Sequence, residues 1–149
     1  MRVYLDVCCL NRPFDDQTQD RLRFESEAIL TILHRCEIGK WKLVTSEVTD
    51  LEISRIPSVD RKRKVAILVS LSDHTIVIDE EIERRALFLR KKGFKPFDAL
   101  HLACAEKWKV DVLLTTDDKF LRKAQRNPKV LKVKMANPAA WLAEVIKNE

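Results

Sequence analysis

The stretch from Lys95 to Cys104, KPFDALHLAC, is the part of the chain from which we read the fold. Almost every residue from Phe97 to Ala105 is apolar, so the helix predicted here should be buried on most sides. Pro96 suits the first turn of this helix, which places Asp98 near the positive end of the helix dipole. Carboxylates are rarely buried unless they are paired or bound to a metal, because desolvating a charge is costly. Asp98 is therefore either a simple first-turn acid or a functional carboxylate, and this stretch alone favours neither.

The length and composition predict one folded domain over residues 1–149. A hydrophobic content of 46% with 34% charged residues is typical of a folded globular protein and excludes a disordered one. The longest apolar runs, such as residues 65–71, are too short to cross a bilayer. The chain starts in a strand-like run without a signal-peptide pattern, so we expect a cytoplasmic protein with no membrane partner.

The cysteines and the charges narrow the class of protein further. Cys8, Cys9, Cys36 and Cys104 have neither zinc-site spacing nor a disulfide framework, so we expect buried free thiols. The formal net charge is +5, and basic residues cluster at 61–64, 90–92 and 119–134. Each cluster alone is typical of a solvated helix face, but together they favour a nucleic-acid partner.

Strand-like and helix-like segments alternate along the whole chain. We expect strands at 2–10, 41–45, 74–78 and 110–115, an edge strand at 130–135, and helices at 18–38, 47–56, 59–71, 80–92, 97–108, 120–125 and 138–146. This alternation predicts a three-layer α/β/α fold with a mostly parallel sheet of four to five strands. Cys8 and Cys9 should then point to opposite faces of the first strand. Ligands of such folds bind beyond the carboxyl ends of the strands, where the strand order reverses.

Four acids are placed so that one cleft at that end of the sheet can gather them. Asp6 lies late in the first strand, Glu52 in the helix after the second, Asp98 at the start of the buried helix, and Asp117 directly after the fourth strand. Carboxylates brought together repel one another and raise one another's pKa values. Mg2+ or Mn2+ removes that conflict, because both prefer oxygen ligands and keep waters that leave room for a phosphate. Such an ion activates water for attack on a phosphodiester, so the predicted substrate is a nucleic acid.

Two members of this set have competitors nearby in the sequence. Glu47 and Asp50 compete with Glu52 for the inward-facing position of their helix, and Asp118 competes with Asp117. His101 lies three residues after Asp98, on roughly the same face of the helix. We expect it to pack or to hydrogen-bond that carboxylate rather than to bind the metal, since a hard cation prefers oxygen.

Three segments together resemble the PIN domain family: residues 3–6 (VYLD), 96–103 (PFDALHLA) and 113–120 (LLTTDDKF). The similarity covers essentially the whole chain and is closest to the VapC-type toxins of bacterial and archaeal toxin–antitoxin pairs. The order of the DALHLA block, the Thr-x-Asp block and a following Phe is specific. Residues 46–52 resemble the signature of the family's second helix, which favours Glu52 over its neighbours.

The resemblance implies a metal-dependent ribonuclease that uses Mg2+ or Mn2+ and cuts RNA. Asp6 and Asp98 would be the firmest metal ligands, Glu52 would hold a second metal or its waters, and Asp117 would complete the catalytic cluster. The resemblance also implies a homodimer and a cognate antitoxin as partner. Supporting or substituting roles at the site are expected for Thr115, His101, Asn11 and Asp118.

The loop after Asp6 departs from the family pattern. The family commonly has Thr or Ser and then Asn soon after its first Asp, whereas Val7 and Cys8 follow here, with Cys8 and Asn11 as substitutes for the missing polar groups. Arg12 is read either as a phosphate contact or as one half of a surface ion pair. A phosphatase of the haloacid-dehalogenase type is disfavoured, because it needs a second Asp at position 8. The main alternative is a non-catalytic relative that binds RNA or another protein, and metal-dependent activity lost on changing Asp98 would separate the two.

Overall fold

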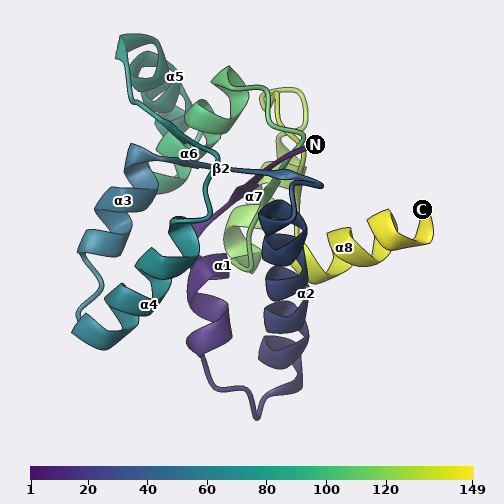
Figure 1. Cartoon of the computed structure of the whole chain (residues 1–149). Helices are drawn as coiled ribbons and strands as arrows, with labels where there is room; N and C mark the ends of the chain where they lie inside the picture. The colour runs from purple at the N-terminus through teal and green to yellow at the C-terminus, as the bar shows by residue number, and fades with distance from the viewer.

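A sheet of five parallel strands with helices on both faces forms the centre of the protein (Figure 1). The computed structural model describes residues 1–149. The strand order is β3-β2-β1-β4-β5, which confirms the predicted α/β class and places β1 in the middle. The strands are β1 (Arg2–Leu5), β2 (Lys42–Ser46), β3 (His74–Ile76), β4 (Val112–Leu114) and β5 (Met135–Ala136).

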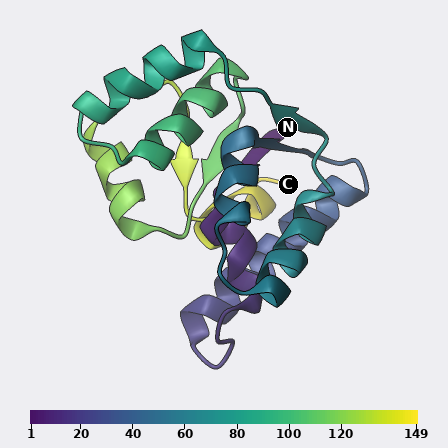
Figure 2. The same cartoon turned by 90° about the vertical axis from the view of Figure 1, so that its left-hand side faces the viewer.

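The helices form two groups, one on each side of the sheet (Figure 2). One hydrophobic core lies between the sheet and the helices α1, α2, α4 and α8, and the other lies between the sheet and α5, α6 and α7. The helix α3 contributes to both cores. The helices are α1 (Val7–Asn11), the 3-10 turn η1 (Arg12–Phe14), α2 (Asp20–Glu37), α3 (Glu47–Ser54), α4 (Val59–Val69), α5 (Glu80–Lys91), α6 (Pro96–Lys107), α7 (Asp118–Arg126) and α8 (Pro138–Lys147).

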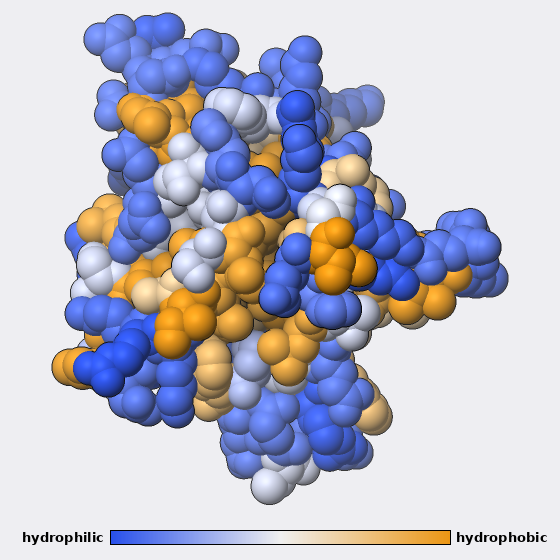
Figure 3. Space-filling view, viewed as in Figure 1, coloured by the Kyte–Doolittle hydropathy of each residue, from blue (hydrophilic) through white to orange (hydrophobic).

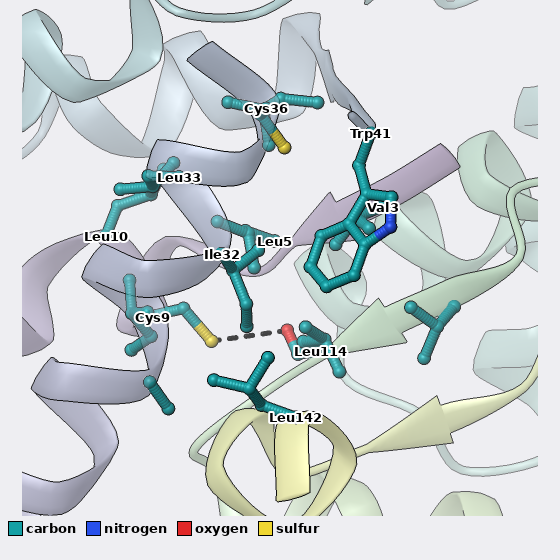
Figure 4. Close-up of a cluster of buried hydrophobic side chains, with 14 of the residues drawn as sticks. Val3, Leu5, Cys9, Leu10, Ile32, Leu33, Cys36, Trp41, Leu114 and Leu142 are labelled. Carbon is teal, nitrogen blue, oxygen red and sulfur yellow. Dashed lines mark hydrogen bonds between the residues drawn. The ribbon is translucent and has the colours of Figure 1, made fainter. Parts of the chain in front are cut away.

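Side chains of the central strand alternate between the two cores. Val3 and Leu5 pack into the core under α2 and α8, whereas Tyr4 points into the core under α6. Figure 4 shows the first of these cores, where Leu5 and Leu114 meet the side chains of α1 and α2. Strands that are buried on both faces have nearly continuous apolar sequences. This pattern is why the parallel sheet could be predicted from the sequence.

Local sequence signals set several helix ends as expected. Ser46 caps α3 by accepting a hydrogen bond from the Thr49 amide at 3.4 Å, and the Thr49 hydroxyl accepts one from the Ser46 amide at 3.3 Å. This reciprocal pair is a capping box. The left-handed φ of Gly39, 81°, and of Gly93, 100°, ends α2 and α5.

The predicted strand over residues 2–10 is wrong in its second half. β1 ends at Leu5, and residues 7–11 form α1, so Cys8 and Cys9 lie on a helix rather than on opposite faces of a strand. A short apolar run is compatible with either a buried strand or a buried helix. The Asp6 side chain accepts a hydrogen bond from the Val7 amide at 2.8 Å, and this cap selects the helix.

The predicted edge strand at 130–135 is also wrong except for its last residue. β5 comprises only Met135–Ala136. The preceding segment turns back on the Asn127 carbonyl, which accepts hydrogen bonds from the Val130 and Leu131 amides. The Lys132 amide is bound by Glu106 at 2.7 Å. These contacts engage the amides that a longer strand would have needed for pairing.

The outer surface is mainly hydrophilic, with apolar side chains gathered over α3 and α4 (Figure 3). Leu51, Val59 and Ile67 are the large exposed apolar side chains of these two helices. None of the helices is both long enough and apolar enough to span a bilayer.

Candidate active site

Asp6 stands at the carboxyl end of the central strand, beside the point where the strand order reverses. The chain leaves β1 for β2 on one side and returns to β4 on the other. One oxygen of Asp6 accepts a hydrogen bond from the Val7 amide, and the other accepts one from the Thr115 hydroxyl at 2.9 Å. The carboxylate is therefore held in one orientation by β4 and by the start of α1.

Asp117 comes to the same edge from β4. Its Oδ1 caps α7 by accepting hydrogen bonds from the Lys119 and Phe120 amides at 3.0 and 3.2 Å. Its Oδ2 has no hydrogen bond within the protein. The Thr115 hydroxyl accepts a hydrogen bond from the Asp117 amide at 3.1 Å while it donates to Asp6. Thr115 thus fixes two acids at once, which agrees with its expected supporting role.

Asp98 lies in the first turn of α6, half-buried, and forms no hydrogen bond or ion pair within the protein. Its pKa is raised to about 7, mainly by burial and in addition by the negative charges of Asp6 and Asp117, while His101 lowers it. A hollow of about 200 Å³ is lined by both Asp98 and Asp117. Asp98 is thus a half-buried carboxylate without a partner, which is costly unless a ligand compensates for it.

Glu52 reaches the site from α3 and is held by His101 of α6. Its Oε1 contacts His101 Nε2, and the same nitrogen lies 3.8 Å from Asp6 Oδ1. The side chain of Glu52 is 24% exposed, whereas that of His101 is fully buried. His101 was expected to pack or to bond Asp98, but the structure gives its hydrogen bond to Glu52. The imidazole faces the packed interface with α3, and Asp98 sits nearer the surface.

A buried hydrogen-bond chain supports His101 from behind. Its Nδ1 is 2.6 Å from the Tyr4 hydroxyl, which is 2.7 Å from the Ser46 hydroxyl. Burial alone would lower the pKa of His101, but the hydrogen bond to Glu52 and the charges of Asp6 and Glu52 raise it above its ordinary value. Tyr4 and Ser46 were not predicted from the sequence as residues of the site. The available signal was a phenol in an otherwise apolar buried strand, since buried tyrosine hydroxyls need a partner.

The two competitors of Glu52 point elsewhere. Glu47 accepts a hydrogen bond from the Ile78 amide at 2.7 Å, and Asp50 is exposed. Asp118, the competitor of Asp117, forms a two-pronged ion pair with Arg21 at 2.7 and 2.8 Å. The structure therefore brings Glu52 and Asp117 into the cluster and leaves their neighbours outside it.

Cys8 occupies the place next to Asp6 where the hydroxyl of related sequences was expected. Its Sγ lies 3.4 Å from Asp6 Oδ2 and 3.3 Å from the Thr115 hydroxyl. Asn11 is turned away, because its amide donates to the Val7 carbonyl and its oxygen accepts from Arg61. Of the two proposed substitutes, only Cys8 contacts the cluster.

Arg12 forms ion pairs with two acids outside the candidate site and has no contact with the four clustered acids. Its guanidinium contacts Asp15 at 3.1 Å and the buried Glu25 at 3.0 Å, and its side chain is 17% exposed. The contact with Glu25 is an ion pair without hydrogen-bond alignment. The structure thus shows Arg12 in the ion-pair role that the sequence left open.

The chemistry of these donors fits a divalent cation. Ligand atoms of Asp6, Glu52 and His101 all lie within 4.8 Å of one another, and Asp98 carries an unpartnered carboxyl group close enough to feel their charges. Carboxylate oxygens are the donors that Mg2+ and Mn2+ prefer. A buried group of acids without a matching cation is electrostatically unfavourable, and a bound ion relieves that repulsion.

Comparison with known proteins agrees with this architecture. The PIN domain family model matches residues 3–126. A chain of VapBC2 from Rickettsia felis, solved bound to a DNA fragment from its promoter, superposes with a TM-score of 0.61 at 14% identity, covering 92% of this chain and 100% of that one. A chain of VapBC-1 from nontypeable Haemophilus influenzae gives 0.57 at 16% identity, covering 93% and 98%. No curated protein sequence matches the chain.

The parallel sheet and the acids at its switch point define the class, an α/β protein with an acidic site at the carboxyl edge of its central strands. The family match extends over most of the chain and includes Asp6, Glu52, Asp98 and Asp117. This protein belongs to the PIN domain family.

Proposed function

We propose that this protein is a metal-dependent endoribonuclease that hydrolyses RNA phosphodiester bonds with Mg2+ or Mn2+. The observation that carries the proposal is the convergence of Asp6, Glu52, Asp98 and Asp117, from four different elements, at one edge of the sheet. The pKa of Asp98 is raised mainly by its burial and also by the charges of Asp6, Asp117 and Glu52, which supports their closeness. Membership of the PIN domain family supports a nuclease with this cluster.

The residues around the site have distinct roles in this proposal. Asp6, Asp98 and Glu52 would hold the ion, and Asp117 would complete the cluster with its free Oδ2. A bound divalent ion supplies a polarised water and stabilises charge that develops on the phosphate. His101 and Thr115 orient Glu52 and Asp6, so little rearrangement is needed when the ion binds. Asp98, whose pKa is raised to about 7, would have to be deprotonated to serve as a ligand, so binding of the ion would release its proton.

We further propose that the protein is the toxin of a toxin–antitoxin pair and acts as a homodimer bound by an antitoxin. The fold shared with chains of VapBC2 and VapBC-1 supports this context. Exposed apolar side chains on α3 and α4, including Leu51, Val59 and Ile67, support a protein partner, because such surface is typical of interaction sites.

The deciding experiment is cleavage of a mixed pool of labelled RNAs by the purified protein. It is run with Mn2+, with Mg2+ and with a chelator, beside Asp98→Asn and the control Asp50→Asn. Asp50 is an exposed carboxylate of α3 outside the cluster. We expect cleavage that requires metal, survives Asp50→Asn and disappears in Asp98→Asn.

Calorimetric titration with Mn2+ separates the other outcomes. Binding to the wild-type protein without cleavage would keep the metal site and refute the RNA substrate. Neither binding nor cleavage would refute the enzyme and leave a non-catalytic module that binds RNA or a protein. Substitution of Cys8 for the family's hydroxyl is the one observation that favours this second candidate.

A further inference from the structure

The helix α7 carries four basic side chains that form no ion pair with any carboxylate: Lys119, Arg122, Lys123 and Arg126. Elsewhere in the chain, Arg21, Arg61 and Arg85 are each matched by an acid. The opposite face of α7 is buried through Phe120 and Ala124. The helix is therefore anchored on one side and presents only uncompensated positive charge on the other.

The spacing of these four charges is unfavourable for the helix itself. Lys119 and Lys123 are four residues apart, as are Arg122 and Arg126, so like charges face each other along the surface. The helix dipole compensates in part at Lys123 and Arg126, which lie in the last turn. A polyanion bound along this face would relieve the remaining repulsion.

Two neighbouring hollows lie beside this face, one lined by basic side chains and one by two of the acids. A hollow of about 340 Å³ on α7 is lined by the four basic side chains and Asn127, without any apolar side chain. The hollow of about 200 Å³ that contains Asp98 and Asp117 shares Lys119 and Lys123 with it. Lys119 and Lys123 therefore border both the basic hollow and the hollow that holds the two carboxylates.

Lys123 is placed at the junction of the two hollows by the connection between α5 and α6. Its Nζ lies 5.9 Å from the centre of the Phe94 ring. A Cβ atom at Gly93 would come within 2.5 Å of that Nζ, so the glycine leaves the space that this ammonium group occupies. Lys123 is accordingly held against the protein surface rather than extended into solvent.

We propose that the α7 face, defined by Lys119, Arg122, Lys123 and Arg126, binds the phosphate backbone of single-stranded RNA and guides it to the acids. The proposal rests on the proposed function and names the path of its substrate. From Lys119 to Arg126 the helix rises about 10 Å, at about 1.5 Å per residue. A face of this length can contact more than one phosphate of the backbone at the same time.

Direct binding measurements test whether RNA binds to the α7 face, and they do not require catalysis. Fluorescence anisotropy of a short labelled single-stranded RNA is recorded over a salt series, with chelator present, for the wild-type protein and for Arg122→Ala/Arg126→Ala. Each lost phosphate contact lowers the salt dependence of log K by about 0.7, which is about fivefold in affinity at about 0.1 M salt. The double variant should therefore bind about 25-fold more weakly at about 0.1 M salt, with a slope smaller by about 1.4.

Two matched variants exclude an effect of net charge alone. Lys42→Ala/Lys147→Ala removes the same charge from exposed, unpaired positions on β2 and α8 and should leave affinity and slope almost unchanged. Arg122→Lys/Arg126→Lys keeps the charge and should restore the wild-type slope. Both changed residues of the test variant are exposed, so an unchanged thermal unfolding curve should confirm that it is folded.

Equal RNA affinity and equal slope for the test and control double variants would overturn the proposal. In that case, loss of binding to polyglutamate by the test variant alone would assign the face to an acidic protein partner. A failed nuclease assay gives a different pattern, because RNA binding in chelator would still depend on Arg122 and Arg126. The path and the catalytic function are thus tested separately.

Discussion

Replacing Asp98 by asparagine should stabilise the metal-free protein above neutral pH, although it removes a functional group. The pKa of Asp98 is about 7 in the folded chain, against an ordinary value of 3.8. A carboxyl whose pKa is raised by folding contributes its full stability below its ordinary pKa, and the contribution is lost as the pH rises through the folded value. The loss therefore develops between about pH 4 and about pH 7 and persists above it.

The size of this effect follows from the difference between the two pKa values. That difference corresponds to about 4 kcal/mol of unfolding free energy once the group is fully ionised. Asp98 is only half-buried, and screening by solvent reduces the figure to about 2 kcal/mol. For a chain of this size, that difference raises Tm by about 4–8 °C.

Thermal unfolding in chelator, followed by circular dichroism, measures this effect at several pH values. At about pH 8 the Asp98→Asn protein should melt above the wild type, and the two should converge near pH 4, where both side chains are neutral. Asp50→Asn should show no such pH-dependent difference. Added Mn2+ should raise the Tm of the wild type and of Asp50→Asn but not that of Asp98→Asn, because the first two retain the full ligand set. A gap between wild type and Asp98→Asn that is constant across this pH range would refute the clustering of charges around Asp98.

Three further changes test the groups around the acids. Tyr4→Phe leaves the buried Nδ1 of His101 unpaired and should lower the free energy of unfolding by about 1–3 kcal/mol, measured by urea denaturation. Cys8→Ser places a stronger hydrogen-bond donor beside Asp6 and should tighten Mn2+ binding by about fivefold, or about 1 kcal/mol, in calorimetric titration; weaker binding would show that the thiol is the better-fitted group. Glu25→Ala leaves two arginines without their buried partner and should destabilise the protein by about 3–5 kcal/mol, whereas a loss below 1 kcal/mol would show that water replaces the pair.

Much of the fold was predictable because the spacing of the apolar residues indicates which segments form helices and which form strands. The helices and the order of strands and helices followed from apolar patterning and from end signals such as Ser46, Gly39 and Gly93. The region after Asp6 was not predictable in the same way, since five apolar or small residues suit a strand and a buried helix equally. Its conformation is decided by Asp6 itself, whose side chain caps α1.

The candidate site was predictable as a set of acids but not as a set of contacts. Asp6 and Asp117 follow strands, and Asp98 lies in the first turn of a helix, so their place at one edge of the sheet follows from the parallel topology. Glu52 lies in the second half of the helix after β2 and reaches the same edge from there. The pairing of His101 with Glu52 depends on how α3 packs against α6, which no local pattern encodes. The same holds for Tyr4, whose hydroxyl acts through a partner 97 residues further along the chain.

The central position of β1 has a consequence for synthesis of the protein. Asp6 leaves the ribosome long before the Thr115 hydroxyl that orients it, which comes 109 residues later. β1 can pair with β2 early, but its other edge stays open until β4 has been made. Contacts of such long separation form late in folding. A nascent chain therefore lacks the complete group of acids until β4 and Asp117 have been made, and the proposed nuclease would become competent only after that point.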